Sequence, residues 1–488
     1  MTPGPGGPRT AVVVGAGLAG LSAALHLCGA GVDVTLLEAE DAAGGRCPDV
    51  AADGYRLELG PTVLTETHLL ESVFAAVGES MADRLTLVDL DPAYVAHFPG
   101  GEVLPMHTDP DRMHRAVADF AGEREAAGYD RFVRRVQRMY DVEMPHFIDR
   151  NLDGVPSLVR PSLGRLAALR GFGRLDRLIG SHFRDERLRQ AFSFQSLYVG
   201  VPPDRARGMF AVVSAMDLVH GVRYPLGGMH AIVRALVRVA QQHGVELRLG
   251  ERVTAVRPAH GGYDVSTTSR SMHVDAVVLT CEPSCAATLL ADPTAARPVS
   301  TPSPSCVLLA AGVPSGLAGT GHHHVHFGRS LQGALDDLTA GRPMRDPSFL
   351  VSVPTRTDPS LAPAGGDVLY ALFPTPAQHG PGAALDWAAL RAPYRDHMLR
   401  RLSTAGYAVD DLVGEHLLTP ADWTARGLPW GTPFSAAHTF RQSGPFRQPN
   451  RLGPRLALAG SGTTPGIGVP MVLISGRLAA DRVLSQHG

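Results

Sequence analysis

Two glycine-rich stretches near opposite ends of the 488-residue chain have residue types and spacing suited to binding an anion. Near the start, Gly15, Gly17 and Gly20 form a G-x-G-x-x-G pattern after the apolar run Val12–Val14. The first glycine permits a tight turn, the second lets the backbone approach a pyrophosphate, and the third lets helix and strand pack closely. The N-terminus of the helix predicted over residues 18–30 adds free N–H groups and a positive dipole end. The pattern therefore predicts a dinucleotide site.

An acidic residue follows at the distance expected of a ribose ligand. Residues 32–38 alternate as a strand, and Glu38 closes it eighteen positions after Gly20. A carboxylate there can accept hydrogen bonds from both ribose hydroxyls, which favours NAD or FAD over NADP.

The next segments distinguish between these two cofactors. A loop carrying Gly45 and Arg46 follows the second strand, and a turn formed by Gly60, Pro61 and Thr62 precedes a further helix. A second glycine loop with an arginine suits a fold over the same pyrophosphate, which NAD enzymes do not need. These segments favour a long, buried FAD.

The second glycine-rich stretch, "GSGTTPGIGVP" at residues 460–470, stands between an apolar run and a helix-like segment. This is again a strand, a turn and a helix. A structural turn without a ligand would have the same pattern, so the stretch alone leaves its role open.

Composition excludes several chemistries. The chain contains no lysine, and its 45 basic residues are all arginine, which rules out a Schiff-base lysine, a lysine-anchored pyridoxal phosphate and a Walker A lysine. The formal net charge of −2 gives no indication of nucleic acid as a partner. Five cysteines without a CxxC pair are typical of reduced thiols in the cytoplasm.

One histidine cluster raises the question of a metal. In "HHHVHF", His322, His324 and His326 would share one face of a strand, and three imidazoles can bind zinc. A strand that faces substrate or solvent explains the cluster more simply, and we predict no metal site.

Many further segments occur in the order of a known family. They are "GAGLAG", "GGR" and "GPTVLT" near the start, then "LRQAFSFQSLYVG", "YPLGGMHAIVRAL", "HHHVHFG", "TPADW", "RQSGPFRQPNR" and "GSGTTPGIGVPMVLISGRLA". Because of these segments, nearly the whole chain resembles the phytoene desaturase family of FAD-dependent carotenoid desaturases. This family belongs to the wider group of amine-oxidase-like flavoproteins.

The resemblance implies a role for the second glycine stretch, because in that family the FAD domain is discontinuous. Gly460, Ser461 and Gly462 would approach the pyrophosphate or ribityl chain of a non-covalent FAD. Gly468, Val469 and Met471 would open a helix under the pyrimidine end of the flavin, where its dipole stabilises the charge of reduced flavin. Val253 would lie by the adenine.

The resemblance also implies an architecture. We expect an α/β protein with a Rossmann-like FAD-binding domain made of residues 9–75, 220–290 and 420–488. Residues 76–219 would form a helical region that contacts substrate or membrane, and residues 291–419 a mixed-sheet substrate domain.

The helical region is rich in arginine. Between Arg131 and Arg189 there are thirteen arginines and seven acids, and large apolar residues recur at every third position from Leu163 to Leu178. A basic amphipathic segment could rest on an anionic bilayer, which would place a cytoplasmic protein peripherally on the inner membrane face. A core-facing helix with solvated arginines has the same spacing.

Desaturation removes a hydride and a proton from adjacent carbons, and flavin N5 can take the hydride. The family's important arginine aligns with Arg160 if a one-residue gap is allowed, but the preceding acid falls on Ser157. Thr464 likewise stands where the family has a histidine. The cofactor site therefore matches the family, whereas the substrate side departs from it.

The leading hypothesis is an FAD-dependent desaturase of a carotenoid or another long isoprenoid or polyene. Its partners would be an apolar substrate and a quinone or oxygen as electron acceptor. The departures at Ser157 and Thr464 also motivate an FAD-dependent isomerase, or an oxidase of a different secondary metabolite. A lipid-binding escort protein of the same fold is the third reading, and the complete dinucleotide motif argues against it.

Overall fold

The computed structural model describes residues 7–197, 199–319 and 321–485. A six-stranded sheet joins both ends of the chain in the order β19-β20-β13-β1-β2-β9. Its strands are β1 (Thr10–Val14), β2 (Asp33–Leu37), β9 (Glu246–Arg248), β13 (Ala276–Leu279), β19 (Arg451–Gly453) and β20 (Leu456–Leu458). The five from β20 to β9 run parallel, with Val13 of β1 paired with Leu36 on one side and Val278 on the other. Such a parallel, buried sheet explains why β1 and β13 are apolar on both faces.

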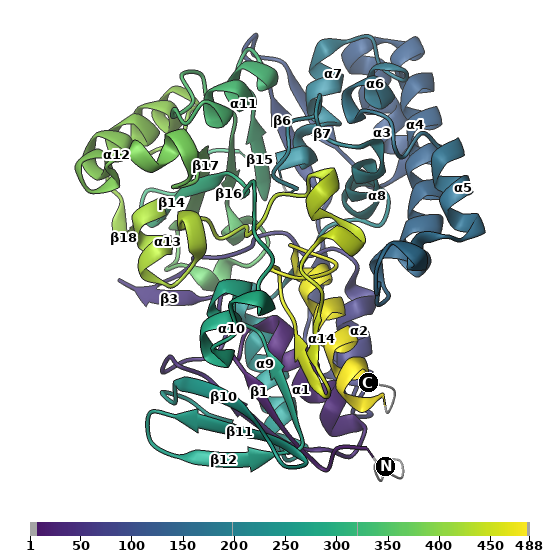
Figure 1. Cartoon of the computed structure of the whole chain (residues 1–488). Helices are drawn as coiled ribbons and strands as arrows, with labels where there is room; N and C mark the ends of the chain where they lie inside the picture. Colours follow the sequence, from purple (N-terminus) through teal and green to yellow (C-terminus); the bar gives the residue numbers. More distant parts are fainter. Residues whose placement is uncertain (1–6, 198, 320, 486–488) are drawn as a thin grey trace.

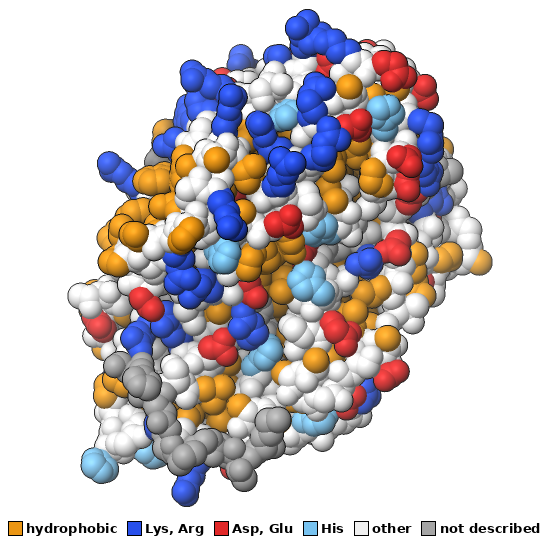
Figure 2. Space-filling view, turned by 90° about the vertical axis from the view of Figure 1, so that its right-hand side faces the viewer, with side chains coloured by type: hydrophobic (Ala, Val, Ile, Leu, Met, Phe, Trp, Pro, Cys, Tyr) orange, Lys and Arg blue, Asp and Glu red, His pale blue; other side chains and the backbone are white. Residues whose placement is uncertain are grey.

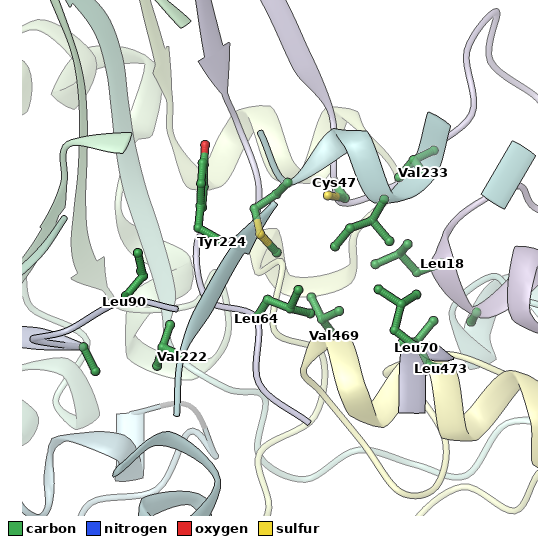
Figure 3. Close-up of a cluster of buried hydrophobic side chains, with 14 of the residues drawn as sticks. Leu18, Cys47, Leu64, Leu70, Leu90, Val222, Tyr224, Val233, Val469 and Leu473 are labelled. Atoms are coloured by element: carbon green, nitrogen blue, oxygen red, sulfur yellow. The ribbon is translucent and has the colours of Figure 1, made fainter. Parts of the chain in front are cut away.

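Two helices, α1 (Leu18–Gly29) and α14 (Val469–Leu484), pack against this sheet, and α2 (Thr67–Ala75) and α9 (His230–Gln242) pack against these helices. Helices α1 and α14 lie against each other, and the Ser22 hydroxyl donates a hydrogen bond of 2.8 Å to the Leu473 carbonyl. Gly476 permits this approach, because a Cβ there would lie 2.3 Å from the Ala19 carbonyl oxygen. Figure 3 shows side chains of α1, α2, α9 and α14 meeting in one buried cluster.

A three-stranded antiparallel sheet forms the outer side of the same part of the molecule. It contains β10 (Val253–Ala259), β11 (Gly262–Thr267) and β12 (Ser271–Val274), and α10 (Pro283–Leu290) packs against β10. Figure 1 shows this sheet at the bottom, with the described ends of the chain close to it.

A seven-stranded sheet lies above, in the order β18-β14-β17-β16-β15-β6-β7. Its strands are β6 (Tyr94–His97), β7 (Val103–Met106), β14 (Ser305–Val313), β15 (His323–His326), β16 (Phe349–Ser352), β17 (Asp367–Thr375) and β18 (Val413–Leu418). Around it lie α11 (Leu331–Thr339), α12 (Trp387–Thr404) and α13 (Pro420–Ala425). Strands β6 and β7 come from the region predicted to be mostly helical, because β6 pairs in parallel with β15, far along the chain.

The two faces of this sheet bury different things, because strand side chains alternate. On β14, Val307 and Leu309 pack with Trp387 and Met398 of α12. Their neighbours Cys306 and Leu308 point the other way and line a cavity. The same alternation continues on β16 and β17, so this sheet forms one wall of the cavity.

The helical region contains α3 (Pro110–Ala121), α4 (Glu123–Glu143), α5 (Pro161–Ala168), α6 (Leu175–Gly180), α7 (Glu186–Ala191) and α8 (Val212–Leu218). The apolar repeat of residues 163–178 does not form one continuous helix. Arg170 (φ 65°) and the glycines around Phe172 separate α5 from α6, leaving Phe172 36% exposed. Only Leu166, Leu175 and Leu178 of the repeat are buried.

Two strand pairs complete the fold: β3 (Asp49–Ala52) with β4 (Tyr55–Glu58), and β5 (Leu87–Asp89) with β8 (Arg223–Pro225). Within the described residues, no helix combines the length and the hydrophobicity that crossing a bilayer would require.

Candidate functional site

One continuous cavity of about 1570 Å³ extends from the carboxyl ends of the parallel strands to the seven-stranded sheet. Glycine loops and acidic residues line the cavity at the end of the parallel strands, and apolar residues line it at the seven-stranded sheet. The crevice at the carboxyl ends of parallel strands is where doubly wound proteins bind nucleotides. The cavity therefore joins a dinucleotide crevice to an apolar chamber.

The two N-terminal glycine loops face each other at this crevice. A Cβ on Gly45 would lie 3.2 Å from the Gly17 Cα atom, and the Gly44 N–H donates a hydrogen bond of 2.9 Å to the Ala16 carbonyl. Gly17 is the N-cap of α1, and no side chain caps this helix. Its first N–H groups are therefore free for an anion, as a pyrophosphate site requires.

Glu38 is held in place beside this helix end. One carboxylate oxygen accepts a hydrogen bond of 2.7 Å from the Ala16 N–H, and the other accepts one of 3.0 Å from the Glu40 N–H. Both contacts fix the carboxylate while it lines the cavity, where it can receive ribose hydroxyls. Val253 lies in the same lining, as the adenine end would require.

Arg46 connects three distant segments across the crevice. Its guanidinium donates hydrogen bonds to the Ser461 hydroxyl and to a carboxylate oxygen of Glu282. The other oxygen of Glu282 accepts a hydrogen bond of 3.0 Å from Ser435. The arginine is partly exposed and lines the cavity, so it can also approach a phosphate.

The second glycine stretch meets the same cavity. Helix α14 begins after Gly468 (φ 117°), and no side chain caps its N-terminus. The Ser475 hydroxyl accepts from the Gly460 N–H at 3.0 Å and donates to the Thr464 carbonyl at 2.9 Å, which holds the turn onto its own helix. A positive helix end therefore faces the cavity, beyond the first glycine loops.

The structure brings the predicted cofactor residues together. Those that line the cavity are Gly15, Gly17, Glu38, Gly45, Arg46, Gly60, Pro61, Thr62, Val253, Gly460, Ser461, Gly462, Gly468, Val469 and Met471. Gly20 lies beneath the crevice instead, where a Cβ would be 1.9 Å from the Gly15 carbonyl oxygen. This is the packing role that the third glycine of the pattern predicts.

Arg160 lies away from this group. It does not line the cavity, and its Nε donates a hydrogen bond of 2.9 Å to the Ser157 carbonyl. It is the N-cap of α5, close to the exposed apolar residues of that region. Its predicted catalytic role stays a prediction that this position does not favour.

The chamber beyond the second glycine stretch is apolar on most sides. Its walls include Phe194, Phe210, Leu308, Val325, Phe327 and Leu372. Among the polar side chains that interrupt this lining, the sequence did not suggest Glu143, Asp217 and His438.

The two carboxyl groups of the chamber are deeply buried. Burial raises the pKa of Asp217 to about 7, although its carboxylate accepts a hydrogen bond of 3.1 Å from Tyr94. Burial also raises the pKa of Glu143 well above its usual range, and its Oε1 has no hydrogen-bond partner among the described residues. Burial therefore favours the uncharged form of Glu143, which suits a chamber for an apolar ligand.

None of the clustered histidines lines the cavity, because His324 and His326 alternate along their strand with Val325 and Phe327, which do. His97 Nε2 and His324 Nδ1 share a hydrogen bond of 2.9 Å, and the rings of His97 and His326 stack with centroids 4.4 Å apart. The His326 Nε2 bonds to the Tyr407 hydroxyl at 2.8 Å. Over the described ranges, no group of three or more histidine, cysteine or acidic side chains has a geometry that would hold a metal ion.

The sequence also matches known proteins along nearly its whole length. The family model for flavin-containing amine oxidoreductases covers residues 18–484. A phytoene dehydrogenase of Streptomyces griseus is 50% identical over 97% of this chain and 94% of that protein. A zeta-carotene-forming phytoene desaturase of Myxococcus xanthus is 34% identical over 98% and 94%.

Solved structures agree on the fold. An oxidoreductase from Methanosarcina mazei superposes with a TM-score of 0.62, covering 96% of this chain and 98% of its own, at 17% identity. A wild-type putrescine oxidase with bound putrescine gives a TM-score of 0.57 at 16% identity, covering 97% and 98%.

Members of the matching family contain flavin, and the residues that line the crevice suit a dinucleotide. A flavin with a dinucleotide is FAD, and the uncapped α1, the oriented Glu38 and the paired glycine loops fit its adenosine and pyrophosphate. The uncapped α14 fits its flavin end. From the sequence matches and this cradle together, the chain belongs to the phytoene desaturase family of flavin-containing amine oxidoreductases.

Proposed function

We propose that the protein is an FAD-dependent desaturase that introduces double bonds into a long isoprenoid of the carotenoid type. The observation that carries this proposal is the continuity of the cavity, which joins the dinucleotide crevice to a chamber walled by apolar side chains. The relatives named phytoene dehydrogenase and zeta-carotene-forming phytoene desaturase support the same substrate class. We propose a quinone or oxygen as the electron acceptor.

When bound, the flavin supplies the hydride acceptor. The chain's own residues then have three tasks. The glycine loops and Glu38 hold the adenosine end, and the positive end of α14 favours negative charge at the flavin end. The apolar walls align the substrate chain and keep water out, which confines the reaction to the substrate carbons that meet the flavin.

Incubation with a panel of polyprenoid substrates in liposomes tests the function. We expect a product that has lost two hydrogens by mass and absorbs at longer wavelength. A product of unchanged mass would instead indicate an isomerase. Unchanged mass and absorption for every isoprenoid would overturn the proposal.

The cavity opens where large apolar side chains are exposed. Val155 is 53% exposed, Val159 79%, Phe172 36%, Phe440 51% and Phe446 39%. All of these except Val159 also line the cavity. Such a cluster around an opening is unusual for a surface that meets only water.

Arginines surround this apolar rim. The exposed arginines of α5 and α6 and the turn between them are Arg165, Arg170, Arg174 and Arg177, and the guanidinium of Arg207 lies 5.4 Å from the Phe440 ring centroid. Figure 2 shows hydrophobic and basic side chains side by side on the upper part of this face. We propose that this rim rests on an anionic bilayer, because arginines can pair with lipid phosphates while apolar side chains enter the acyl boundary. The opening would then receive a lipid-dissolved substrate directly.

A further inference from the structure

His438 is a buried imidazole on the wall of the chamber. Its residue is 8% exposed, and its backbone N–H donates a hydrogen bond of 2.8 Å to the Val199 carbonyl, which fixes the main chain. The structure gives its side chain no hydrogen-bond partner among the described residues. Because no group among these residues occupies its ring nitrogens, the imidazole is available to a ligand in the cavity that it lines.

The ring is held against the loop of residues 461–469, which we call the flavin-side loop. A Cβ on Gly466 would lie 2.2 Å from His438 Cε1 and 2.4 Å from Nε2, so only glycine permits this contact. Gly466 (φ 137°) stands between Ser461 and Val469, the two ends of the segment that meets the cofactor. On another side, the Phe210 ring meets the imidazole edge to face, with centroids 5.7 Å apart. The packing therefore fixes the orientation of the imidazole.

Arg447 is the charged group that acts on this ring. Its guanidinium is buried and donates hydrogen bonds to the carbonyls of Ala436, Gln442, Ser461 and Thr463, so it ties the segment of His438 to the flavin-side loop. Burial and the charge of Arg447 hold the pKa of His438 well below its usual range. The imidazole is therefore neutral at physiological pH and has a free lone pair.

The proposed reaction needs such a group. When a hydride leaves one carbon, a C–H bond on the adjacent carbon must also break. Its electron pair becomes the new double bond, and its proton needs an acceptor. The guanidinium of an arginine only donates. Burial favours the protonated form of Glu143, and the carboxylate of Asp217 already accepts a hydrogen bond from Tyr94.

We propose that His438 is the catalytic base of the desaturation, accepting at a ring nitrogen the proton that leaves the carbon next to the hydride donor. This inference rests on the proposed function. The substrate loses a hydride to the flavin, which is reduced, and a proton to the imidazole, which becomes imidazolium. Burial and Arg447 disfavour the imidazolium, so it releases the proton and returns to the neutral form.

The first test replaces the ring without removing its shape. His438→Phe keeps the aromatic contact with Phe210 but has no proton acceptor. We expect normal flavin absorbance, a KM within about threefold of wild type, and a kcat reduced about 10²- to 10⁴-fold, the usual contribution of a general base. His260→Phe is the matched control, because His260 is exposed on the turn between β10 and β11. If His438→Phe does not bind flavin, His438→Gln provides the same comparison in a polar side chain of low basicity.

Two further measurements separate a base from a structural residue. Added imidazole should raise the kcat of His438→Ala at least about tenfold, whereas pyrrole, which has no free lone pair on nitrogen, should leave it unchanged. In wild-type holoprotein, diethyl pyrocarbonate should modify His438, as read by peptide mass, and the apolar probe squalene should protect it. This second readout does not depend on turnover.

The outcomes are distinguishable. An active wild type whose His438→Phe variant keeps kcat within threefold overturns the assignment alone. Absence of imidazole rescue, or failure of squalene to protect His438, also argues against it. A wild type that converts no isoprenoid overturns the proposed function, and the role of His438 with it.

Discussion

Arg46 donates a hydrogen bond to the hydroxyl of Ser461, which lies 415 residues further along the chain. The same guanidinium pairs with Glu282, so one side chain fixes the relative positions of the three segments that form the dinucleotide crevice. A partly exposed arginine with free donors can in addition contact the pyrophosphate.

We therefore expect Arg46→Ala to weaken FAD binding. Loss of charge-assisted hydrogen bonds costs about 1.5–3 kcal/mol, which corresponds to about 10- to 150-fold in Kd. Titration of the apoprotein with FAD, followed by flavin fluorescence, measures this change. Arg56→Ala is the control, because Arg56 is more exposed and its nearest acid is 3.6 Å away. Equal affinities of the two variants would contradict the role of Arg46.

Two glycines of the first pattern should respond differently to alanine. A Cβ at Gly17 would meet only ordinary contacts, the nearest 3.8 Å away at Gly45 Cα, whereas a Cβ at Gly20 would lie 1.9 Å from the Gly15 carbonyl oxygen. We expect Gly17→Ala to fold normally but to bind FAD at least about tenfold more weakly, because the methyl group occupies the pyrophosphate approach.

Gly20→Ala should instead lose about 1–3 kcal/mol or more of folding stability, since helix and strand must move apart. Urea unfolding of the apoproteins and FAD titration together separate the two effects. A destabilised Gly17→Ala, or a stable Gly20→Ala, would show that the roles of these glycines are assigned wrongly.

Acid should destabilise the protein through its buried histidines. Burial lowers the pKa of His26, His97 and His323 to about 4, and burial with nearby arginines does the same for His182. The unfolded chain, with pKa near 6.5, then binds more protons than the folded one. The contribution of these groups to stability is complete above pH 6.5 and is lost as the pH falls from about 6.5 to 4. Urea midpoints measured across this range should therefore decrease.

His182 can test whether buried histidines cause the acid sensitivity. Neither of its ring nitrogens has a hydrogen-bond partner among the described residues, and its ring packs edge to face on Phe132. His182→Phe should flatten the decrease in urea midpoint below pH 6.5, whereas the exposed His260→Phe should leave it unchanged. An identical pH profile for wild type and His182→Phe would mean that other groups cause the acid sensitivity.

The apolar rim of the cavity should govern membrane binding. A Val159→Asp, Phe172→Asp double variant places two anions among the exposed arginines and removes two apolar contacts. We expect its binding to vesicles containing anionic phospholipid, measured by co-sedimentation, to fall at least about tenfold. Leu249→Asp is the matched control, because Leu249 is 43% exposed but lies after β9 of the dinucleotide sheet. Equal sedimentation of both variants would argue against this docking face.

Local patterns predicted most of the glycine and acidic residues that the structure gathers around the cavity. The spacing of Gly15, Gly17 and Gly20, the acid at Glu38, and the glycines of both chain ends reflect contacts within a few residues or demands of one bound molecule. Such requirements are visible in the sequence because each is met by a short segment.

Contacts between distant segments were not predictable in this way. Strand β6 lies in the region that was expected to be mostly helical, and its residues form a strand because Val95 pairs with His324 of β15. His438 is a single histidine that belongs to no motif. Its position on the cavity wall depends on its packing against Gly466, which is distant in sequence from the first glycine pattern. Gly171 and Gly173 already indicated in the sequence that the three-residue apolar repeat would not form a single helix, and the chain divides it around Arg170.

The sheet that carries the cofactor takes its first strand from the start of the chain and β20 from residues 456–458. During synthesis, β1 and its glycine turn emerge long before β20 and α14 have left the ribosome. The nascent chain therefore holds only half of a flavin site while its chamber walls are being translated. Loading of the cofactor must follow closure of the sheet by these last segments, and a chain released before residue 456 would remain colourless however well its earlier parts had folded.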